Sequence, residues 1–167
     1  MVVFASFEKI LGPEAPFGYA LSRHLSAELQ RQFLLRSFRL SAIRQRAIAR
    51  LYLSGKIDQH LHHLRGLLLE QAGEMSKLLG QHLGDLVTYR MPAGGATFWL
   101  GVTRAVDMRK AFHYLLARQV VMAPGELFSV CGLHHQHLRL SNTFHGQPNL
   151  DSALALVGEA LRDAQIS

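Results

Sequence analysis

The sequence predicts an α+β fold, in which a long helix is followed by a small, mostly antiparallel sheet with flanking helices on one side. Apolar residues recur at helical spacing from residue 57 to about residue 83. Beyond residue 85 the periodicity changes, and short strand-like runs flank a Pro-Ala-Gly-Gly turn at 92–95. Helix signals then alternate with further short strands up to the C-terminal end. This order of elements is typical of a sheet that carries its helices on one face.

The first fifty residues alternate short apolar runs with turns and helix signals. Residues 1–7 (MVVFASF) form an apolar run that predicts a buried strand, and residues 17–21 predict a second strand after a Gly/Pro-rich loop. Ser26 is expected to be the N-cap of a helix. Residues 41–53 predict another helix, ended by a Ser-Gly pair.

The strongest helix signal follows directly. Six apolar residues recur three, four or seven positions apart: Ile57, Leu61, Leu64, Leu68, Met75 and Leu79. Gly84 supplies a stop. At ~1.5 Å per residue such a helix is about 40 Å long. That length is unusual in so small a chain, and we expect this helix to connect two lobes.

The second half of the chain mixes strands and helices. Strands are predicted at 86–90, 97–102, 120–123 and 137–141. In the last of these, Leu138 and Leu140 face one way and Arg139 the other. Asp107 and Asn149 are expected to cap the two helices of this half. No internal repeat or low-complexity segment interrupts the pattern.

Composition and charge restrict the class of protein. Hydrophobic residues make up 49% and charged residues 18% of the 167 residues, as in a folded protein. No apolar run approaches the ~20 residues of a membrane-spanning helix, and no basic residue precedes the first apolar run as in a signal peptide. Cys131, the single cysteine, cannot form an internal disulfide, which favours a cytoplasmic location.

The net charge of +6 is concentrated in one region. Seven arginines and one acidic residue, Glu28, lie between Arg23 and Arg50. Such a patch can meet nucleic acid. A solvated helix face, or a surface that meets an acidic partner, explains it more simply, because no aromatic residues or recognition motif accompany the charge.

The most informative motif surrounds Lys9. The tetrapeptide from Ser6 to Lys9 formally fits S-x-x-K, but the S-D-N and K-T-G partners of that serine-acylation motif are absent. The longer segment SFEKILGPEAPFGY resembles the lysine segment of fold-type-I aminotransferases that depend on pyridoxal 5'-phosphate (PLP). It resembles in particular that of MocR-type regulators in the GntR family, S-F-S-K-T-L-x-P-x-L-R-x-G-Y. This resemblance implies that Lys9 binds PLP covalently as a Schiff base and that Ser6 binds its phosphate.

Four further motifs carry the resemblance along nearly the whole chain and in the same order. The helix segment HLHHLRGLL resembles H-x-R-R-L-R, PAGG followed by FWL resembles P-x-G-G-x-x-x-W-L, and VMAPGELF resembles V-x-x-x-P-G-x-x-F. Finally LRLS, at 138–141, resembles L-R-L-S-F, in which the arginine holds the α-carboxylate of the substrate. Arg139 is therefore the implied carboxylate ligand, a role that suits its forked guanidinium. Its alternative role is a salt bridge at a strand edge.

Two residues depart from the family pattern. Glu8 replaces the serine before the lysine, and Pro16 replaces the arginine that binds the cofactor phosphate. A lost charge-assisted hydrogen bond and an added like charge each cost about 1–3 kcal/mol. Together they weaken cofactor binding by roughly 10²-fold.

The resemblance also implies how the chain is organised. Residues 1–55 correspond to a remnant of the large PLP-binding domain, 56–84 to the interdomain helix and 85–167 to the small C-terminal domain. The family's upstream residues, which hold most of the cofactor site, and the winged-helix DNA reader of MocR proteins have no counterpart here. We therefore expect a C-terminal portion of a regulator that is not catalytic alone.

The expected partners follow from the same resemblance. They are an amino acid or amine effector, a second copy of the chain, and DNA only through a missing N-terminal domain; no membrane is expected. Two alternatives stay open: a truncated metabolic aminotransferase that transfers amino groups between an amino acid and a 2-oxoacid, and a cofactor-free interaction module.

The ten histidines do not indicate a native metal site. His60 and His63 are three residues apart on a predicted helix, whereas metal-binding helices usually place two histidines four residues apart. A second histidine group, His134, His135 and His137, falls in a predicted loop and at the start of a strand.

Overall fold

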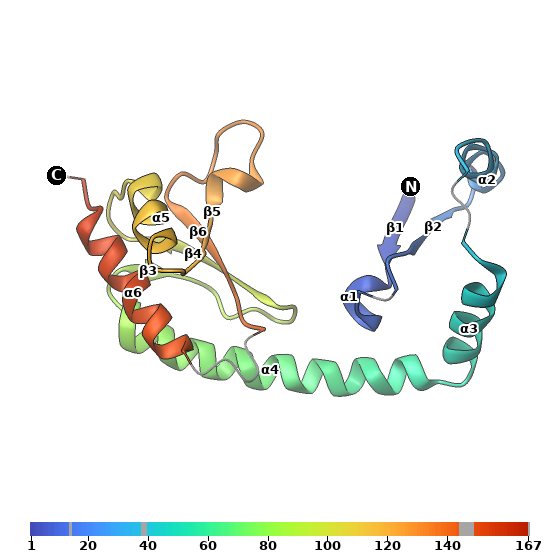
Figure 1. The fold of residues 1–167 in the computed structure, drawn as a ribbon, viewed down its shortest axis with the longest axis horizontal. Helices are drawn as coiled ribbons and strands as arrows, with labels where there is room; N and C mark the ends of the chain where they lie inside the picture. The colour runs from blue at the N-terminus through green and yellow to red at the C-terminus, as the bar shows by residue number, and fades with distance from the viewer. Residues whose placement is uncertain (14, 38–39, 144–148, 167) are drawn as a thin grey trace. The chain divides into compact units, whose positions relative to one another are not determined.

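The computed structural model describes residues 1–13, 15–37, 40–143 and 149–166. The chain forms two compact units, Met1–His63 and Leu64–Ser167. The first half contains β1 (Val2–Ser6), α1 (Glu8–Leu11), β2 (Gly18–Ser22), α2 (Ser26–Leu35), α3 (Ala42–Leu53) and the start of α4 (Lys56–Leu83). After α4 follow β3 (Val87–Thr88), β4 (Thr97–Val102), α5 (Met108–Leu116), β5 (Ala123–Pro124), the 3-10 turn η1 (Gly125–Phe128), β6 (His137–Ser141) and α6 (Leu150–Asp163). Figure 1 labels the helices and strands.

A two-stranded antiparallel hairpin begins the first unit. β1 pairs with β2 from Val2 opposite Ser22 to Ser6 opposite Gly18. The four-residue helix α1 lies in the connection between the two strands. It begins two residues after Ser6, which pairs with Gly18 at this end of the hairpin. The ring of Phe7 packs against those of Phe17 and Tyr19, with centroids 6.1 and 5.4 Å apart.

The prediction of a buried strand at residues 1–7 is wrong about burial. The strand is present, but every residue of β1 is exposed or half-buried. Phe4 is 70% exposed, and Ala15 and Ile57 are the only buried apolar residues among those described in this unit. A short apolar run predicts a strand from local preference, whereas burial depends on what packs over it.

The helix predicted after Ser26 is confirmed, but its capping residue is not. Leu25 occupies the N-cap position and Ser26 is the first helical residue. The hydroxyl of Ser22 instead accepts a hydrogen bond from the backbone N–H of Leu25, at 3.2 Å. The helix predicted at 41–53 is found as α3, with Ser41 at its N-cap and no side-chain capping bond.

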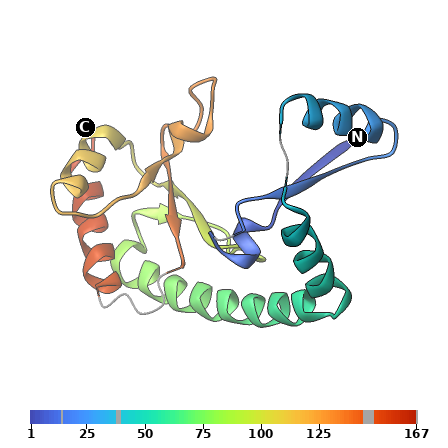
Figure 2. The same cartoon turned by 45° about the vertical axis from the view of Figure 1, so that its right-hand side comes forward.

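Helix α4 matches its prediction closely. It spans 28 residues, and the boundary between the two compact units falls within it. Along the part that belongs to the second unit, Met75 and Leu79 are fully buried. Figure 2 shows α4 as one continuous helix, coloured from teal to green.

The second unit is built on a four-stranded antiparallel sheet of order β3–β4–β6–β5. Strands β4 and β6 match the predicted segments. Strand β3 is shorter than the predicted 86–90, and β5 lies at Ala123–Pro124 rather than at 120–123. The register across the centre places Trp99 opposite Arg139 and Leu100 opposite Leu138.

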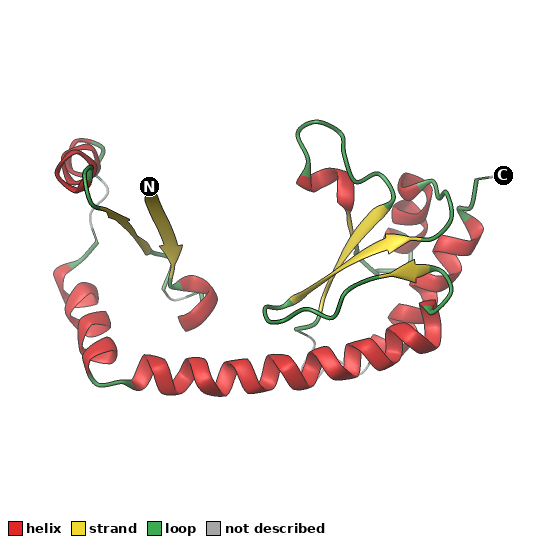
Figure 3. Ribbon diagram, turned by 180° about the vertical axis from the view of Figure 1, so that it is seen from behind, coloured by secondary structure: helices red, strands yellow, loops and turns green. Residues whose placement is uncertain are grey.

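One face of this sheet carries the core. Alternation along β4 and β6 buries four side chains: Phe98, Leu100, Leu138 and Leu140. Buried residues of α4, α5 and α6 complete the same apolar cluster. Figure 3 shows the helices in red beside the yellow strands. The predicted α+β fold with helices on one side of an antiparallel sheet is thus confirmed. The opposite, open face of the sheet carries exposed or half-buried residues, namely Trp99, Gly101, His137 and Arg139.

The capping predictions in this unit differ in outcome. The carboxylate of Asp107 accepts hydrogen bonds from the backbone N–H groups of Arg109 and Lys110, both at 3.0 Å. Asn149 occupies the N-cap of α6, but its side chain makes no capping bond.

Candidate functional site

The predicted cofactor-binding residues lie at the start of the first unit. Ser6 is the last residue of β1, and Lys9 follows on α1. The hydroxyl oxygen of Ser6 accepts a hydrogen bond from the backbone N–H of Glu8, at 3.1 Å. Lys9 is exposed, as are Ser6 and Glu8.

Helix α1 is short but well anchored. The carbonyl of Phe7 accepts hydrogen bonds from the N–H groups of Ile10 and Leu11, at 2.9 and 2.7 Å. Gly12 ends the helix with a φ of 90°, a conformation that few other residues adopt. A ring nitrogen of His60 on α4 lies 2.7 Å from the carbonyl of Ile10. These contacts fix the backbone that carries Lys9.

The residues around Lys9 suit covalent attachment of PLP better than they suit binding of its phosphate. An exposed amine is sterically open to an aldehyde, and the hydroxyl of Ser6 donates to no acceptor among the described residues, so its hydrogen can be donated to a phosphate. Pro16 is exposed and offers no hydrogen-bond donor to a phosphate. The exposed carboxylate of Glu8 adds a like charge beside the serine. This segment therefore offers PLP two groups, the amine of Lys9 for covalent attachment and the hydroxyl of Ser6 for the phosphate.

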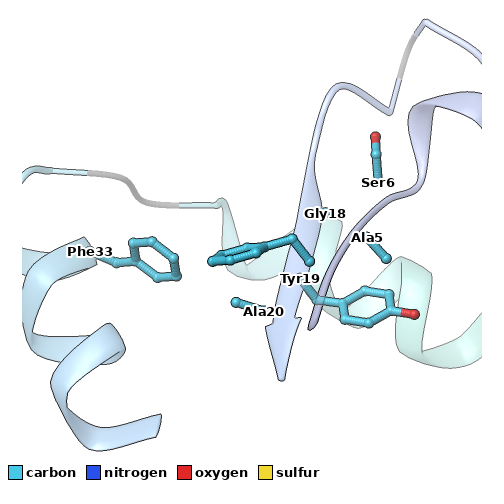
Figure 4. Close-up of a pocket in the computed structure, with 7 residues that line it drawn as sticks. Ala5, Ser6, Gly18, Tyr19, Ala20 and Phe33 are labelled. Carbon is cyan, nitrogen blue, oxygen red and sulfur yellow. The ribbon is translucent and has the colours of Figure 1, made fainter. Parts of the chain in front are cut away.

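The hairpin also borders a hollow that sequence reasoning missed. It has a volume of about 500 Å³ and is lined mainly by apolar side chains. The lining residues are Phe4, Ala5, Ser6, Gly18, Tyr19, Ala20 and Phe33. Figure 4 shows the ring of Phe33 on its helix facing the hairpin. No sequence signal indicates this hollow, because Phe33 is separated from the hairpin by a turn and most of α2.

The predicted carboxylate ligand, Arg139, belongs to the second unit. It lies on the open face of the sheet, opposite Trp99 on one side and Ala123 on the other. Its guanidinium carbon is 4.6 Å from the centroid of the Phe128 ring, a cation–π contact. Arg139 makes no ion pair among the described residues, so the alternative of a salt bridge at the strand edge is not found there.

Aromatic side chains surround this arginine on the open face. The Trp99 ring meets the edges of Phe128 and His134, at 5.5 and 5.4 Å between centroids. It also stacks on His137, at 5.5 Å with 20° between the planes. The strand alternation predicts that Trp99 and Arg139 share a face, whereas the approach of Phe128 and His134 depends on the loop between η1 and β6.

A shallow hollow of about 400 Å³ continues from Trp99 toward β3. Its lining comprises Thr88, Tyr89, Arg90, Trp99, Gly101 and His137. Arg90 is exposed, so the hollow is aromatic with a positive charge at its border.

The arginine-rich segment of the first unit lies on α2 and α3 and in the turns around them. Its described arginines are exposed, and Arg39 lies outside the described residues. Arg31 donates two hydrogen bonds to Glu28, at 2.8 and 2.9 Å. These bonds, together with one from Gln32, hold the pKa of Glu28 below its ordinary value. The nearby exposed arginines on α3 lack such a partner among the described residues.

Metal ligands do not cluster in the described part of the chain. No group of three or more His, Cys, Asp or Glu side chains is arranged to hold a metal ion there. Cys131 is exposed in the loop between η1 and β6. No described helix is both long and apolar enough to cross a membrane.

Curated relatives of the chain are HTH-type transcriptional regulators. It is 28% identical over 127 residues to the uncharacterized HTH-type transcriptional regulator YisV of Bacillus subtilis, covering 76% of this chain and 26% of that protein. It is 24% identical to the HTH-type transcriptional regulator NorG of Staphylococcus aureus, covering 92% of this chain and 35% of that protein. The chain therefore spans about a third or less of the length of these relatives. No family model matches it.

Solved structures with this fold are aminotransferases. The α-aminoadipate aminotransferase LysN of Thermus thermophilus, complexed with N-(5'-phosphopyridoxyl)-L-leucine, matches with a TM-score of 0.83 and 22% identity, covering 97% of this chain and 42% of that one. The valine-pyruvate aminotransferase AvtA of Salmonella typhimurium matches with a TM-score of 0.84 and 13% identity, covering 96% of this chain and 44% of that one. The resemblance inferred from the sequence is thereby confirmed: the chain has the fold of the C-terminal part of a fold-type-I aminotransferase, and the curated relatives that it matches are HTH-type transcriptional regulators.

Proposed function

We propose that the chain is the C-terminal portion of the aminotransferase-like domain of a MocR-type transcriptional regulator. One combination of findings carries this proposal. The chain has an aminotransferase fold along 97% of its length, while its curated relatives are regulators rather than metabolic enzymes. In the longer protein, residues 1–55 are part of the large domain, 56–84 form the interdomain helix and 85–167 form the small domain.

The proposed roles belong to three residues, Lys9 and Ser6 in the first unit and Arg139 in the second. Lys9 holds PLP covalently through its amine, and the Ser6 hydroxyl donates to the phosphate. Arg139 binds the carboxylate of an amino acid effector through two parallel N–H donors. When bound, PLP supplies electron withdrawal from the bonds at the carbon next to the amine. Binding of the effector then changes how the regulator binds DNA through its N-terminal domain.

Glu8 and Pro16 determine what we expect of the isolated chain. Because each departs from the family pattern at the phosphate, we expect weak PLP binding and no transaminase turnover. A cytoplasmic location and a homodimer complete the proposal, as for regulators whose sites form between two copies. The same two residues favour the second candidate, a folded interaction module that does not bind PLP.

The first test is covalent trapping of PLP. The purified chain is incubated with PLP, reduced with borohydride and mapped by peptide mass spectrometry, with Lys9→Ala as the blank. We expect an adduct on Lys9 in preference to Lys56, which is exposed on the same unit and serves as an internal comparison. Equal labelling of Lys9 and Lys56 would mean that PLP reacts with surface amines only, and would favour the interaction module.

A gain-of-binding pair sharpens this test. Glu8→Ser and Pro16→Arg each restore the family pattern, and each is expected to tighten PLP binding about tenfold, because a like charge is removed or a charge-assisted bond is added. Dissociation constants from the visible absorbance of bound PLP measure the change. If neither variant tightens binding, the assignment of the phosphate to this segment is wrong.

The proposal also separates a regulator from a metabolic enzyme. Sequencing the coding region upstream of this chain decides between them. A winged helix-turn-helix segment supports the regulator, and a large aminotransferase domain alone supports the truncated enzyme.

A further inference from the structure

The open face of the sheet in the second unit carries two adjacent rows of paired strand residues, each of which includes one aromatic ring. The first row runs from Thr88 across Gly101 to His137, and the second from Trp99 to Arg139. Residues two apart on a strand face the same way and are ~7 Å apart along it. A ligand with a carboxylate in the second row and a ring in the first therefore has to bridge only a short distance.

Three ring contacts hold Trp99 in place beside Arg139. Phe128 receives the Arg139 guanidinium on its face and also contacts the Trp99 ring at a steep angle, with 81° between the planes. His137 stacks on Trp99, and His134 packs against both. Each side chain in this cluster restricts the next, so the arginine and the tryptophan are positioned before any ligand arrives.

Gly101 forms the floor of the hollow beside Trp99. A Cβ atom at this position would lie 3.4 Å from Nε2 of His137 and 3.5 Å from the hydroxyl oxygen of Thr88. The space is thus large enough for a methyl group in ordinary contact, and the glycine leaves it empty. The edge of a flat ring, which is about as thick as a methyl group, can enter this space between His137 and Thr88.

His137 provides a hydrogen-bond donor toward this floor. Its Nδ1 is buried and has no hydrogen-bond partner among the described residues. Because a buried N–H without an acceptor is rarer than a buried acceptor without a donor, we assign the ring proton to Nε2. Nε2 and Cδ2 are the ring atoms of His137 nearest to the Cβ position of Gly101, at 3.4 and 3.5 Å.

The charges on this face select an anion. Arg139 and Arg90 are exposed and make no ion pair among the described residues. The nearby acid Glu126 lies 3.6 Å from the guanidinium of Arg109, which offsets its charge. The face is therefore aromatic and positively charged.

We infer that this face binds an aromatic carboxylate, with the carboxylate on Arg139 and the ring against Trp99 above Gly101. This inference rests on the proposed role of Arg139 and names the class of effector. An aliphatic carboxylate of the same length satisfies the arginine but leaves the hollow and the exposed part of Trp99, 37% of its surface, uncovered.

The chain supplies its own probe, because Trp99 is its only tryptophan. The full chain is titrated with 3-phenylpropionate, propionate and the neutral 3-phenylpropanamide, and Trp99 fluorescence is excited at the red edge, where phenyl groups do not absorb. We expect 3-phenylpropionate to bind at least about tenfold more tightly than either of the other two.

Variants test the two contacts separately. Arg139→Gln is expected to weaken 3-phenylpropionate binding about 10–100-fold, and Gly101→Ala to weaken it several-fold by filling the floor. The matched control is Arg118→Gln, since Arg118 also lies over an aromatic ring, that of Tyr114 at 3.6 Å, but on α5 and its C-terminal turn. This variant should bind as the unchanged chain does.

Each contrary outcome has a distinct meaning. If propionate binds as tightly as 3-phenylpropionate, the aromatic class is wrong and the role of Arg139 stands. If the amide binds as tightly as the acid, or Arg139→Gln has no effect, the role of Arg139 fails and the inference with it. If no probe changes the fluorescence at about millimolar concentration, the inference is overturned, while trapping of PLP on Lys9 remains an independent test of the proposed function.

Discussion

The side chain of Gln136 makes the two hydrogen bonds to Val106 that the backbone of a neighbouring strand would otherwise make. Its amide oxygen accepts a hydrogen bond from the backbone N–H of Val106 at 2.9 Å, and its amide nitrogen donates to the carbonyl of the same residue at 3.0 Å. Val106 is buried, with 4% of its surface exposed. The N–H and C=O of Val106 are therefore satisfied by a side chain, which no sequence pattern predicts. The residues on either side of Val106 bond instead to the backbone of Ala164 and Ile166.

Gln136→Ala is expected to lower the free energy of unfolding by about 2 kcal/mol, because it leaves two buried backbone groups without partners. Urea unfolding followed by Trp99 fluorescence measures this change. Gln81→Ala is the control, since Gln81 is exposed on α4, and should stay within about 0.5 kcal/mol. Equal stability of the two variants would mean that water replaces the amide of Gln136.

The surroundings of Gly125 explain why a glycine follows the proline in the segment VMAPGELF. A Cβ atom here would lie 2.5 Å from the carbonyl oxygen of His134 and 2.9 Å from that of His137. Only a glycine allows the loop after η1 to return this close to its start. The motif thus has a structural reason at this position, independent of any ligand.

We expect Gly125→Ala to lower the free energy of unfolding by about 1–3 kcal/mol, since backbone atoms must move to admit the methyl group. Gly94→Ala is the matched control, because Gly94 lies in the connection between β3 and β4 of the same unit and nothing lies within 4 Å of its Cβ position. Thermal or urea unfolding distinguishes them. A Gly125 variant as stable as the Gly94 variant would show that the loop is free to shift.

At the scale of elements, the two helices of the second unit begin in different ways. Asp107 caps α5 with two backbone hydrogen bonds, whereas Asn149 occupies the same position on α6 and makes none. Both residues are favourable N-caps by type, so the sequence predicts the helix starts and not which cap forms its bond.

The difference gives a direct comparison of two caps. Asp107→Ala is expected to lower the free energy of unfolding by about 1 kcal/mol, because two N–H groups lose their acceptor. Asn149→Ala should change it by less than about 0.5 kcal/mol. Circular dichroism during urea unfolding reports both. A larger loss for Asn149→Ala would indicate that its amide caps α6 in solution.

How far the sequence predicts these elements depends on which interactions define them. Helix α4 and strands β4 and β6 are predicted well, because regular apolar periodicity is read directly from neighbouring positions. The role of Ser26 is not, because the nearby Ser22 accepts the backbone bond in its place. The burial of β1 is not either, because it depends on side chains distant in sequence. For the same reason the sequence indicates Lys9 and Arg139 as candidates through motifs, but not the ring of Phe128 beneath the arginine.

At the scale of the whole molecule, the two units differ in how much core they contain. The apolar cluster of the described chain lies entirely in the second unit, where it joins α4, α5, α6 and the sheet. The first unit exposes large apolar side chains, including Phe4, Ile43 and Leu53 at 70, 80 and 89%. Local opening should therefore cost far less free energy in the first unit than in the second.

Hydrogen exchange measured by mass spectrometry on the full chain tests this difference. Helices α3 and α6 form a matched pair of 12 and 14 residues; α3 has no buried residue among those described, and α6 buries five. We expect amides of α6 to exchange at least about a hundredfold more slowly than those of α3, since opening α6 exposes core residues such as Leu154 and Leu161. Comparable protection of α3 would mean that a second copy covers the first unit. Dilution then decides, because protection from self-association falls with concentration and protection within one chain does not.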